Sequence, residues 1–251
     1  MSRRKSFFES RNPVMNEKAF HNAAQSVDPA ISRGETMTVQ GAINKTFILS
    51  AIMLATAVWG FASPSPLFMW GGAIAGFVVV IFASFKPHLS PTLAPIYAGL
   101  EGLFVGSISA IYASMFNGII FQAVTLTMAV LFIMLFIYKT GIIKVTQKLR
   151  AGIVMATGAI VVVYLVSIVL SLFGITVPYL HQAGPIGIGI SLVIIGVAAM
   201  NLLLDFDNFE KGEQYGVPSY MEWFSAMGLL ITLVWLYIEI LRLIAMFSSS
   251  D

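Results

Sequence analysis

The stretch TLAPIYAGLEGLFVGSISAIYASMF, residues 92–116, decides the fold class because it places one acid, Glu101, inside a long apolar run. At 1.5 Å of rise per residue, a helix of this length crosses the hydrocarbon core of a bilayer, which is about 30 Å thick. An ionisable side chain inside such a helix is costly, so it is expected to be functional or very well paired. The stretch therefore predicts a membrane-spanning helix with a polar site inside it.

The composition of the whole chain supports a membrane protein. Of its 251 residues, 58% are hydrophobic and only 10% are charged, and the mean hydropathy is +0.87. Such a chain cannot cover itself with a water-facing surface of ordinary polarity. The absence of cysteine excludes disulfides, thiolate metal sites and a thiol nucleophile. Residues 1–40 are polar and lack the apolar core of a secretory signal.

Seven apolar segments are each long enough to span a bilayer. They are Thr46–Ala62, Pro66–Phe85, Thr92–Phe116, Ile119–Tyr138, Gly152–Phe173, Ile186–Leu204 and Phe224–Met246. Helices are expected because backbone polar groups in hydrocarbon must be satisfied within the segment. The sequence thus predicts an all-α, polytopic membrane protein with a polar tail over residues 1–45, a seven-helix bundle over 46–246 and a short tail over 247–251.

The distribution of basic residues predicts the orientation. If the N-terminus is cytoplasmic, thirteen of the 14 Lys and Arg residues fall on the cytoplasmic side, and the remaining one, Arg242, lies in the seventh segment. The positive-inside rule then gives seven spans, with the N-terminus inside and the C-terminus outside a cell membrane. A six-span alternative brings the C-terminus inside and requires one segment, most plausibly the seventh, to be re-entrant, or two neighbouring segments to fuse.

The third segment carries a ridge of small residues beside Glu101. The ridge recurs every four residues and consists of Ala94, Ala98, Gly102, Gly106, Ala110 and Ser114. Small residues at this spacing let a neighbouring helix approach closely, so the segment is expected to be buried. Glu101 is then near the midplane, either as a protonated acid bonded between helices or as a residue of conduction or gating.

The seventh segment has a polar face. Ser225, Thr232 and Glu239 follow one another at intervals of seven residues, which places them on one side of a helix. Such a face is expected to line the centre of the bundle. Glu239 and Arg242, at i and i+3, can pair on this face, either for a role in conduction or gating or as a structural ion pair.

A third group of polar residues closes the sixth segment. Asn201, Asp205 and Asn208 share a helix face, and the segment is expected to end near Leu204. A carboxylate at a helix C-terminus meets the negative end of the macrodipole and is partly desolvated, and both effects favour the protonated form. Asp205 is therefore a candidate pH-sensing residue.

At these residues the chain resembles the bacterial branch of the Bax inhibitor-1 family. The resemblance rests on Glu101-Gly102-Leu103-Phe104-Val105-Gly106, on Asp205, and on Ile240-Leu241-Arg242-Leu243-Ile244 at the end of the seventh segment, and it covers residues 46–246. It implies a bundle with the seventh helix at its centre, a bacterial inner-membrane location and a pH-sensitive calcium leak.

The resemblance also implies a latch in which one aspartate on the sixth helix and one on the seventh share a proton. Asp205 matches the first aspartate, but the second position falls at or near Thr232, which cannot ionise. Asp207 or Glu222 could supply the second acid at the cytoplasmic end, so both remain candidate pH-sensing residues.

The available oxygen ligands favour passage of calcium over tight binding. Ca²⁺ prefers six to eight oxygen ligands, and the apolar segments offer few, with Glu101 and Asp205 as weak metal candidates. Conduction needs weak binding, so a leak of partly hydrated Ca²⁺ is easier to build than a closed site. The expected partners are the bilayer, Ca²⁺ and protons, with no cofactor and no nucleic acid.

Two other classes of function can be compared with a leak. An enzyme is not expected, because His88 and His181 fall in loops on opposite sides and no serine or aspartate pair is placed for intramembrane proteolysis. A regulatory protein that binds a membrane partner, such as a membrane protease, remains the alternative. Phe7, Phe8 and Phe20 in the tail could then form a docking segment.

Overall fold

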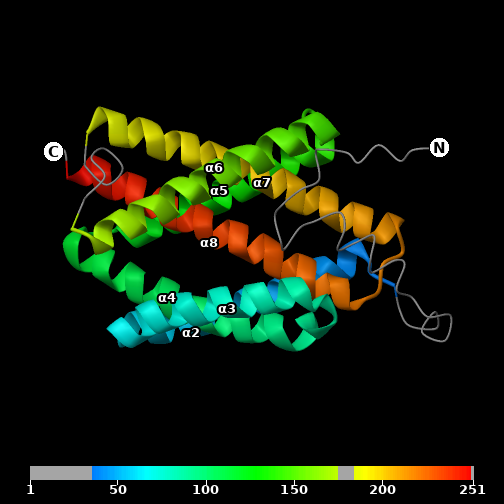
Figure 1. Cartoon of the computed structure of the whole chain (residues 1–251), viewed down its shortest axis with the longest axis horizontal. Coiled ribbons are helices and arrows are strands. Elements are labelled where there is room, and N and C mark those ends of the chain that lie inside the picture. The colour runs from blue at the N-terminus through cyan, green and yellow to red at the C-terminus, as the bar shows by residue number, and fades with distance from the viewer. Residues whose placement is uncertain (1–35, 175–183, 250–251) are drawn as a thin grey trace.

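The computed structural model describes residues 36–174 and 184–249, apart from the side chain of Leu172, and these residues form a helical bundle (Figure 1). The elements are α2 (Val39–Ala62), η1 (Leu67–Gly71), α3 (Gly72–Phe85), η2 (Pro87–Leu89), α4 (Ser90–Met115), α5 (Ile119–Thr140), α6 (Gln147–Leu172), α7 (Pro185–Gln214) and α8 (Tyr220–Ser248). Counting η1 with α3 and η2 with α4, seven spans are long and apolar enough to cross a membrane. The predicted all-α polytopic fold is confirmed.

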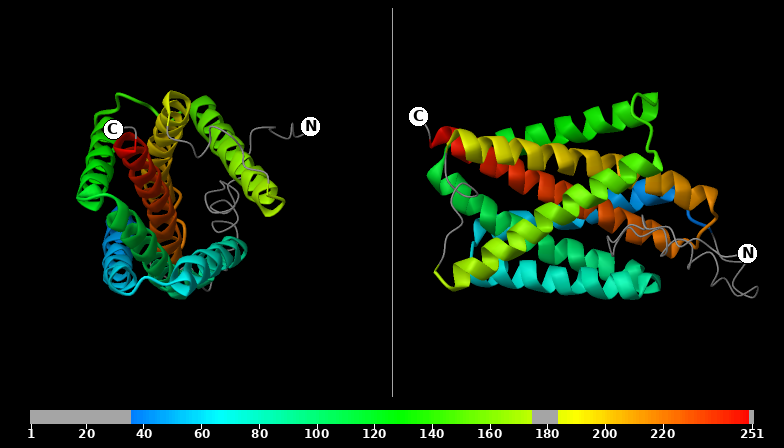
Figure 2. Two further views of the ribbon diagram at one scale, coloured as in Figure 1. Left: turned by 90° about the vertical axis from the view of Figure 1, so that its left-hand side faces the viewer. Right: turned by 45° about the horizontal axis from the view of Figure 1, so that its top comes forward.

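Helix α8 is the central helix of the bundle. It runs between a layer of α2, α3 and α4 and a second layer of α5, α6 and α7, and the end-on view shows the other helices around it (Figures 1 and 2). Within its apolar stretch 67% of α8 is buried, compared with 11% for α2 and for α6. The expected central position of the seventh span is confirmed.

The two ends of the bundle differ in charge. Helices α2, α4, α6 and α8 begin at one end, and α3, α5 and α7 finish there, as the contacts of Thr38 with Glu222 and of Tyr138 with Glu210 require. This end carries the basic residues Lys45, Lys86, Lys139, Lys148, Arg150 and Lys211. We call it the basic end and the opposite one, where α8 finishes, the far end.

The predicted small-residue ridge brings α4 against α2. Ala94, Ala98, Gly102 and Gly106 are buried, whereas Ser114 is exposed. A Cβ at Gly106 would lie 2.1 Å from the carbonyl oxygen of Ala57 in α2, and one at Gly102 would lie 2.3 Å from that of Met53. The two backbones are therefore in direct contact, a packing that only glycine permits.

Two helices extend further than their apolar runs. Helix α2 begins at Val39 because the Thr38 hydroxyl caps it by accepting a hydrogen bond from the amide of Gly41, at 2.9 Å. Helix α7 continues to Gln214 and is followed by Gly216, which has a φ of 60°. It passes Leu204 without ending because Phe206 and Phe209 remain buried against neighbouring helices.

The length of α7 corrects one expectation. Asp205 lies more than two turns before the end of the helix and not at its C-terminus, so the negative end of the macrodipole does not act on it. Its environment is instead set by its burial between helices.

Candidate functional site

Polar side chains follow α8 through the centre of the bundle. Glu222, Ser225, Thr232 and Glu239 are all at most 8% exposed, although most residues of the helix are apolar. From Glu222 to Glu239 the helix rises about 26 Å, which is most of the thickness of a bilayer core. The expected polar face of the seventh span is thus present at the centre. Together with Asp205, which α7 adds from the side, we call these residues the α8 column.

The far end of the column is a hydrogen-bonded cluster around Glu239. Its carboxylate accepts from the Tyr164 hydroxyl of α6 at 2.9 Å and from the Ser191 hydroxyl of α7 at 2.7 Å. The Arg242 guanidinium lies 3.3 Å from the same carboxylate and donates to the Tyr164 oxygen at 2.8 Å. The expected pairing of Glu239 with Arg242 is confirmed, and it joins three helices.

The middle of the column is the contact between Asp205 and Thr232. Asp205 is 3% exposed, and the Thr232 hydroxyl is in hydrogen-bonding position to its carboxyl group. The same hydroxyl lies 3.3 Å from the carbonyl oxygen of Gly228. Oδ2 of Asp205 is buried and has no hydrogen-bond partner among the described residues. Thr232 therefore occupies the place opposite Asp205 where the family resemblance implies a second aspartate.

Asp207, two residues further along α7, belongs to an ion-pair cluster. Its carboxylate pairs with Arg150 of α6 and with Lys211 of α7, the latter at 2.9 Å. Arg150 is 4% exposed and also donates to Oδ1 of Asn208 at 3.0 Å. Asp207 thus forms ion pairs with two cations, so it is placed to hold α6 against α7 and not to share a proton with Asp205.

Glu222 at the basic end holds the segment before α2. Its Oε1 accepts from the amide of Thr38 at 3.0 Å and from the Thr38 hydroxyl at 3.1 Å. The carboxylate also fills the space beside Gly41, where a Cβ would lie 1.9 Å from Oε1. Glu222 is therefore a capping residue of α2, and neither it nor Asp207 is the acid that faces Asp205.

Glu101 lies outside the α8 column, at the contact between α4 and α3. It is 9% exposed, as expected for a residue beside the ridge, and Tyr97 is its hydrogen-bond partner. Its Oε2 lies 3.0 Å from the position that a Cβ on Gly76 would take. Glu101 and the column are thus two separate buried acidic sites.

The candidate metal ligands are dispersed. No group of three or more His, Cys, Asp or Glu side chains in the described part of the chain could hold a metal ion. The weak calcium candidates, Glu101 and Asp205, belong to different helix contacts. A dehydrated calcium site would need more oxygen ligands than either of them gathers.

The sequence analysis missed three residues that complete these clusters. Tyr164 and Ser191 bind Glu239, and Arg150 is the buried partner of Asp207. Tyr164 places a hydroxyl group within the apolar run IVVVYLVSI, residues 160–168, and this polar group in an apolar helix could have marked Tyr164 as a candidate site residue. Arg150 was counted only as a cytoplasmic charge, and nothing local marks it as buried.

The chain matches the model of a known protein family. The model of the family described as Bax inhibitor 1 like matches residues 12–249, which is nearly the whole chain. A comparison with curated proteins finds no match to this sequence. The family match agrees with the residues that carry the resemblance and with a seven-helix bundle around α8. This membrane-spanning chain therefore belongs to the Bax inhibitor 1 like family.

Proposed function

We propose that the protein is a slow, pH-sensitive leak for cations, with Ca²⁺ as the permeant ion, across a cell membrane. The observation that carries the proposal is the α8 column. Glu222, Asp205 and Glu239 lie near the start, middle and end of a central helix and are at most 8% exposed. Acids at successive depths lower the electrostatic barrier for a cation without binding it tightly.

The described conformation is the closed one in this proposal. Ser225, Thr232 and Glu239 are covered by the surrounding helices, so a cation reaches them only when those helices separate. Glu239 is tied to α6 and α7, and Asp207 is tied to α6 through Arg150. Separation must break these contacts, which accounts for slow flux.

Asp205 supplies the pH sensitivity. It is the acid of the column whose Oδ2 lacks a hydrogen-bond partner among the described residues. A charged carboxylate so placed is costly unless it is paired or hydrated, so its charge state and the packing around it are coupled. We further propose that the basic end faces the cytoplasm, where the positive-inside rule places most of the basic residues.

The test is calcium flux into liposomes that contain the purified full-length protein and a trapped calcium dye, measured at several pH values. We expect influx above that of empty vesicles, with a rate that changes with pH. A Glu210→Gln variant is the matched control for variants of the acids in the α8 column, because Glu210 is an exposed acid that is bonded to Tyr138 outside the column. Influx equal to that of empty vesicles at every pH would refute the proposal.

A regulatory protein with a membrane partner is the second candidate function. The observation in its favour is the attachment of Thr36–Thr38, which joins the tail to the basic end. Met37 is buried, and its amide donates to the carbonyl of Val217 at 2.7 Å. Phe7, Phe8 and Phe20 lie outside the described residues. Flux that is absent from liposomes, together with a partner that requires residues 1–35, would favour this function over a leak.

A further inference from the structure

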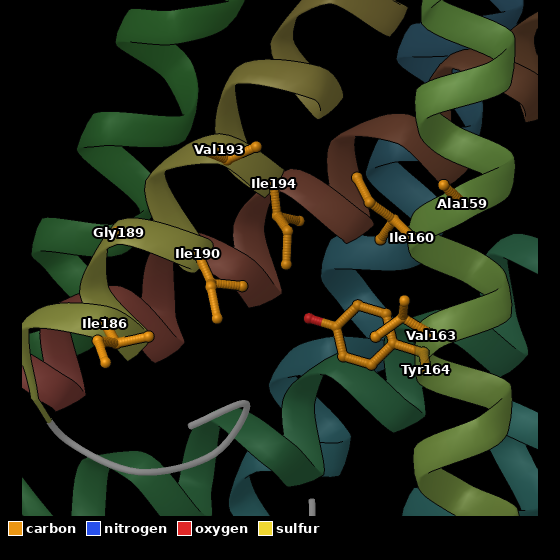
Figure 3. Close-up of a pocket in the computed structure, with 9 residues that line it drawn as sticks. All are labelled: Ala159, Ile160, Val163, Tyr164, Ile186, Gly189, Ile190, Val193 and Ile194. Carbon is orange, nitrogen blue, oxygen red and sulfur yellow. The ribbon is translucent and has the colours of Figure 1, made fainter. Parts of the chain in front are cut away.

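An apolar groove of about 450 Å³ lies between α6 and α7 near the far end (Figure 3). Its walls are formed by Ile160, Val163 and Tyr164 of α6 and by Ile186, Ile190 and Val193 of α7. The rim is open, since Val193 is 66% and Val163 48% exposed. Both helices are long and apolar enough to span the membrane, so the groove opens sideways into lipid and the part of an occupant that contacts its walls must be apolar.

The floor of the groove is polar at one point. Figure 3 shows Tyr164 directed from α6 into the gap, toward Ile190 of α7. Its hydroxyl donates to Glu239 and accepts from Nη1 of Arg242. Nη2 of Arg242 is buried and has no hydrogen-bond partner among the described residues. Because Nη1 and Nη2 share one carbon, the unused donor is close to the Tyr164 hydroxyl.

The dimensions and charge of the groove fit one leaflet of a bilayer. From Ile186 to Val193 the wall extends roughly 10 Å, against about 15 Å for half of a bilayer core. A centred α8, about 44 Å long, extends about 7 Å beyond each face of a core about 30 Å thick, so Arg242, about 9 Å before its last residue, falls near the level at which acyl chains meet their ester groups. Glu239 neutralises Arg242, so the floor suits a neutral oxygen acceptor better than a free anion.

We propose that the groove is a binding site for a phospholipid, with one acyl chain between α6 and α7. The acyl chain fills a gap in the packing of α6 against α7. An ester oxygen of the lipid accepts a hydrogen bond from Nη2 of Arg242, a donor that has no partner among the described residues. The lipid thereby bridges α6 to the end of α8.

The test is photo-crosslinking in vesicles of phosphatidylethanolamine and phosphatidylglycerol, with a phosphatidylglycerol that carries a diazirine in one acyl chain. After irradiation, the labelled residues of the full-length protein are mapped by mass spectrometry. We expect the groove walls to be labelled several-fold more than Ile74 and Phe77, which are also exposed on a membrane-spanning helix. Equal labelling would mean that only bulk lipid touches the groove and would overturn the proposal.

Two glycines of α7 provide a matched pair of variants. A Cβ at Gly189, in the groove wall, meets nothing within 4 Å, and the same is true of Gly196, which is seven residues further along and outside the groove. Gly189→Phe should therefore fold, fill the groove and reduce labelling several-fold. Gly196→Phe should label like the parent. Undiminished labelling of the groove in Gly189→Phe would contradict the proposal.

Two further variants test the contact with the lipid ester and the main competing occupant. Arg242→Lys keeps the charge beside Glu239 but removes Nη2, and it should lower groove labelling several-fold while the protein still melts cooperatively.

A second copy of the protein is the main competing occupant of the groove. The parent sequence has no cysteine, so the Val193→Cys variant carries a single one, at the rim of the groove. Disulfide-linked dimers formed through it in dilute vesicles would assign the groove to a second copy.

Discussion

The hydroxyl of Thr232 on α8 faces the carboxyl of Asp205 on α7 in the buried centre of the bundle. A threonine hydroxyl has one proton to donate. It can donate to Gly228, 3.3 Å away, while it accepts from a protonated Asp205, or it can turn and donate to an ionised one. The hydrogen bonding of α8 at this level therefore depends on the charge of a residue on α7.

The first prediction concerns Asp205. Asp205→Asn keeps the shape and hydrogen bonding of a protonated acid but cannot ionise. Flux into liposomes should stay at the level that the parent reaches when Asp205 is protonated, and most of its pH dependence should be lost. The melting temperature in detergent should show that the variant is folded. A full pH response in folded Asp205→Asn would remove Asp205 as the sensor.

The second prediction concerns the residue opposite Asp205. Thr232→Asp places two carboxyl groups in contact, and such a pair shares one proton because both cannot ionise together at low cost. The flux of this variant should respond to pH more steeply than that of the parent. Thr232→Asn is the control, since it is polar but does not titrate. Indistinguishable pH profiles for the Asp and Asn variants would mean that position 232 does not interact with Asp205 during gating.

The third prediction concerns the ion pairs of Asp207. Asp207→Asn removes a carboxylate partner of Arg150, which is 4% exposed, and loss of a buried ion pair costs about 3 kcal/mol. The midpoint of thermal unfolding in detergent should fall by several degrees. Lys211→Met removes the more exposed partner and should cost less than about 1 kcal/mol. Equal losses in the two variants would contradict the central role of Arg150.

The fourth prediction concerns the contact between α2 and α4. Gly106→Ala adds a methyl group 2.1 Å from the Ala57 carbonyl oxygen, so α2 must shift, at a cost of about 1–3 kcal/mol. Gly196→Ala adds the same group to open space on α7 and should be neutral or slightly stabilising. Thermal melting of both proteins measures the difference. A Gly106→Ala protein as stable as the parent would show that the two helices can separate freely.

The fifth prediction concerns orientation. With seven spans and a cytoplasmic basic end, reporters fused at Met1 and at Asp251 should label opposite sides of the membrane. The N-terminal reporter should be cytoplasmic. Detection of both reporters on the cytoplasmic side would support six spans, and the assignment of the far end to the outside of the membrane would then be wrong.

The sequence by itself determined the features that depend on local spacing. The length of each apolar run identifies the membrane-spanning segments. The four-residue spacing of Gly102 and Gly106 marks the face of α4 that packs on α2. The pairing of Glu239 with Arg242 follows from their i, i+3 spacing on one helix. These features were predictable because a helix in lipid must satisfy its own backbone, so its length and its faces are set by nearby residues.

Only the tertiary structure decided which helix each polar group meets. Asp207 pairs with Arg150, which is 57 positions away in the sequence, and Glu222 caps α2 across 184 positions, while Thr232 lies opposite Asp205. The passage of α7 beyond Leu204 likewise depends on helices that cover Phe206 and Phe209. Such contacts are set by the packing of whole helices, where an acid takes the nearest partner that offsets the cost of its burial, and no local pattern names that partner.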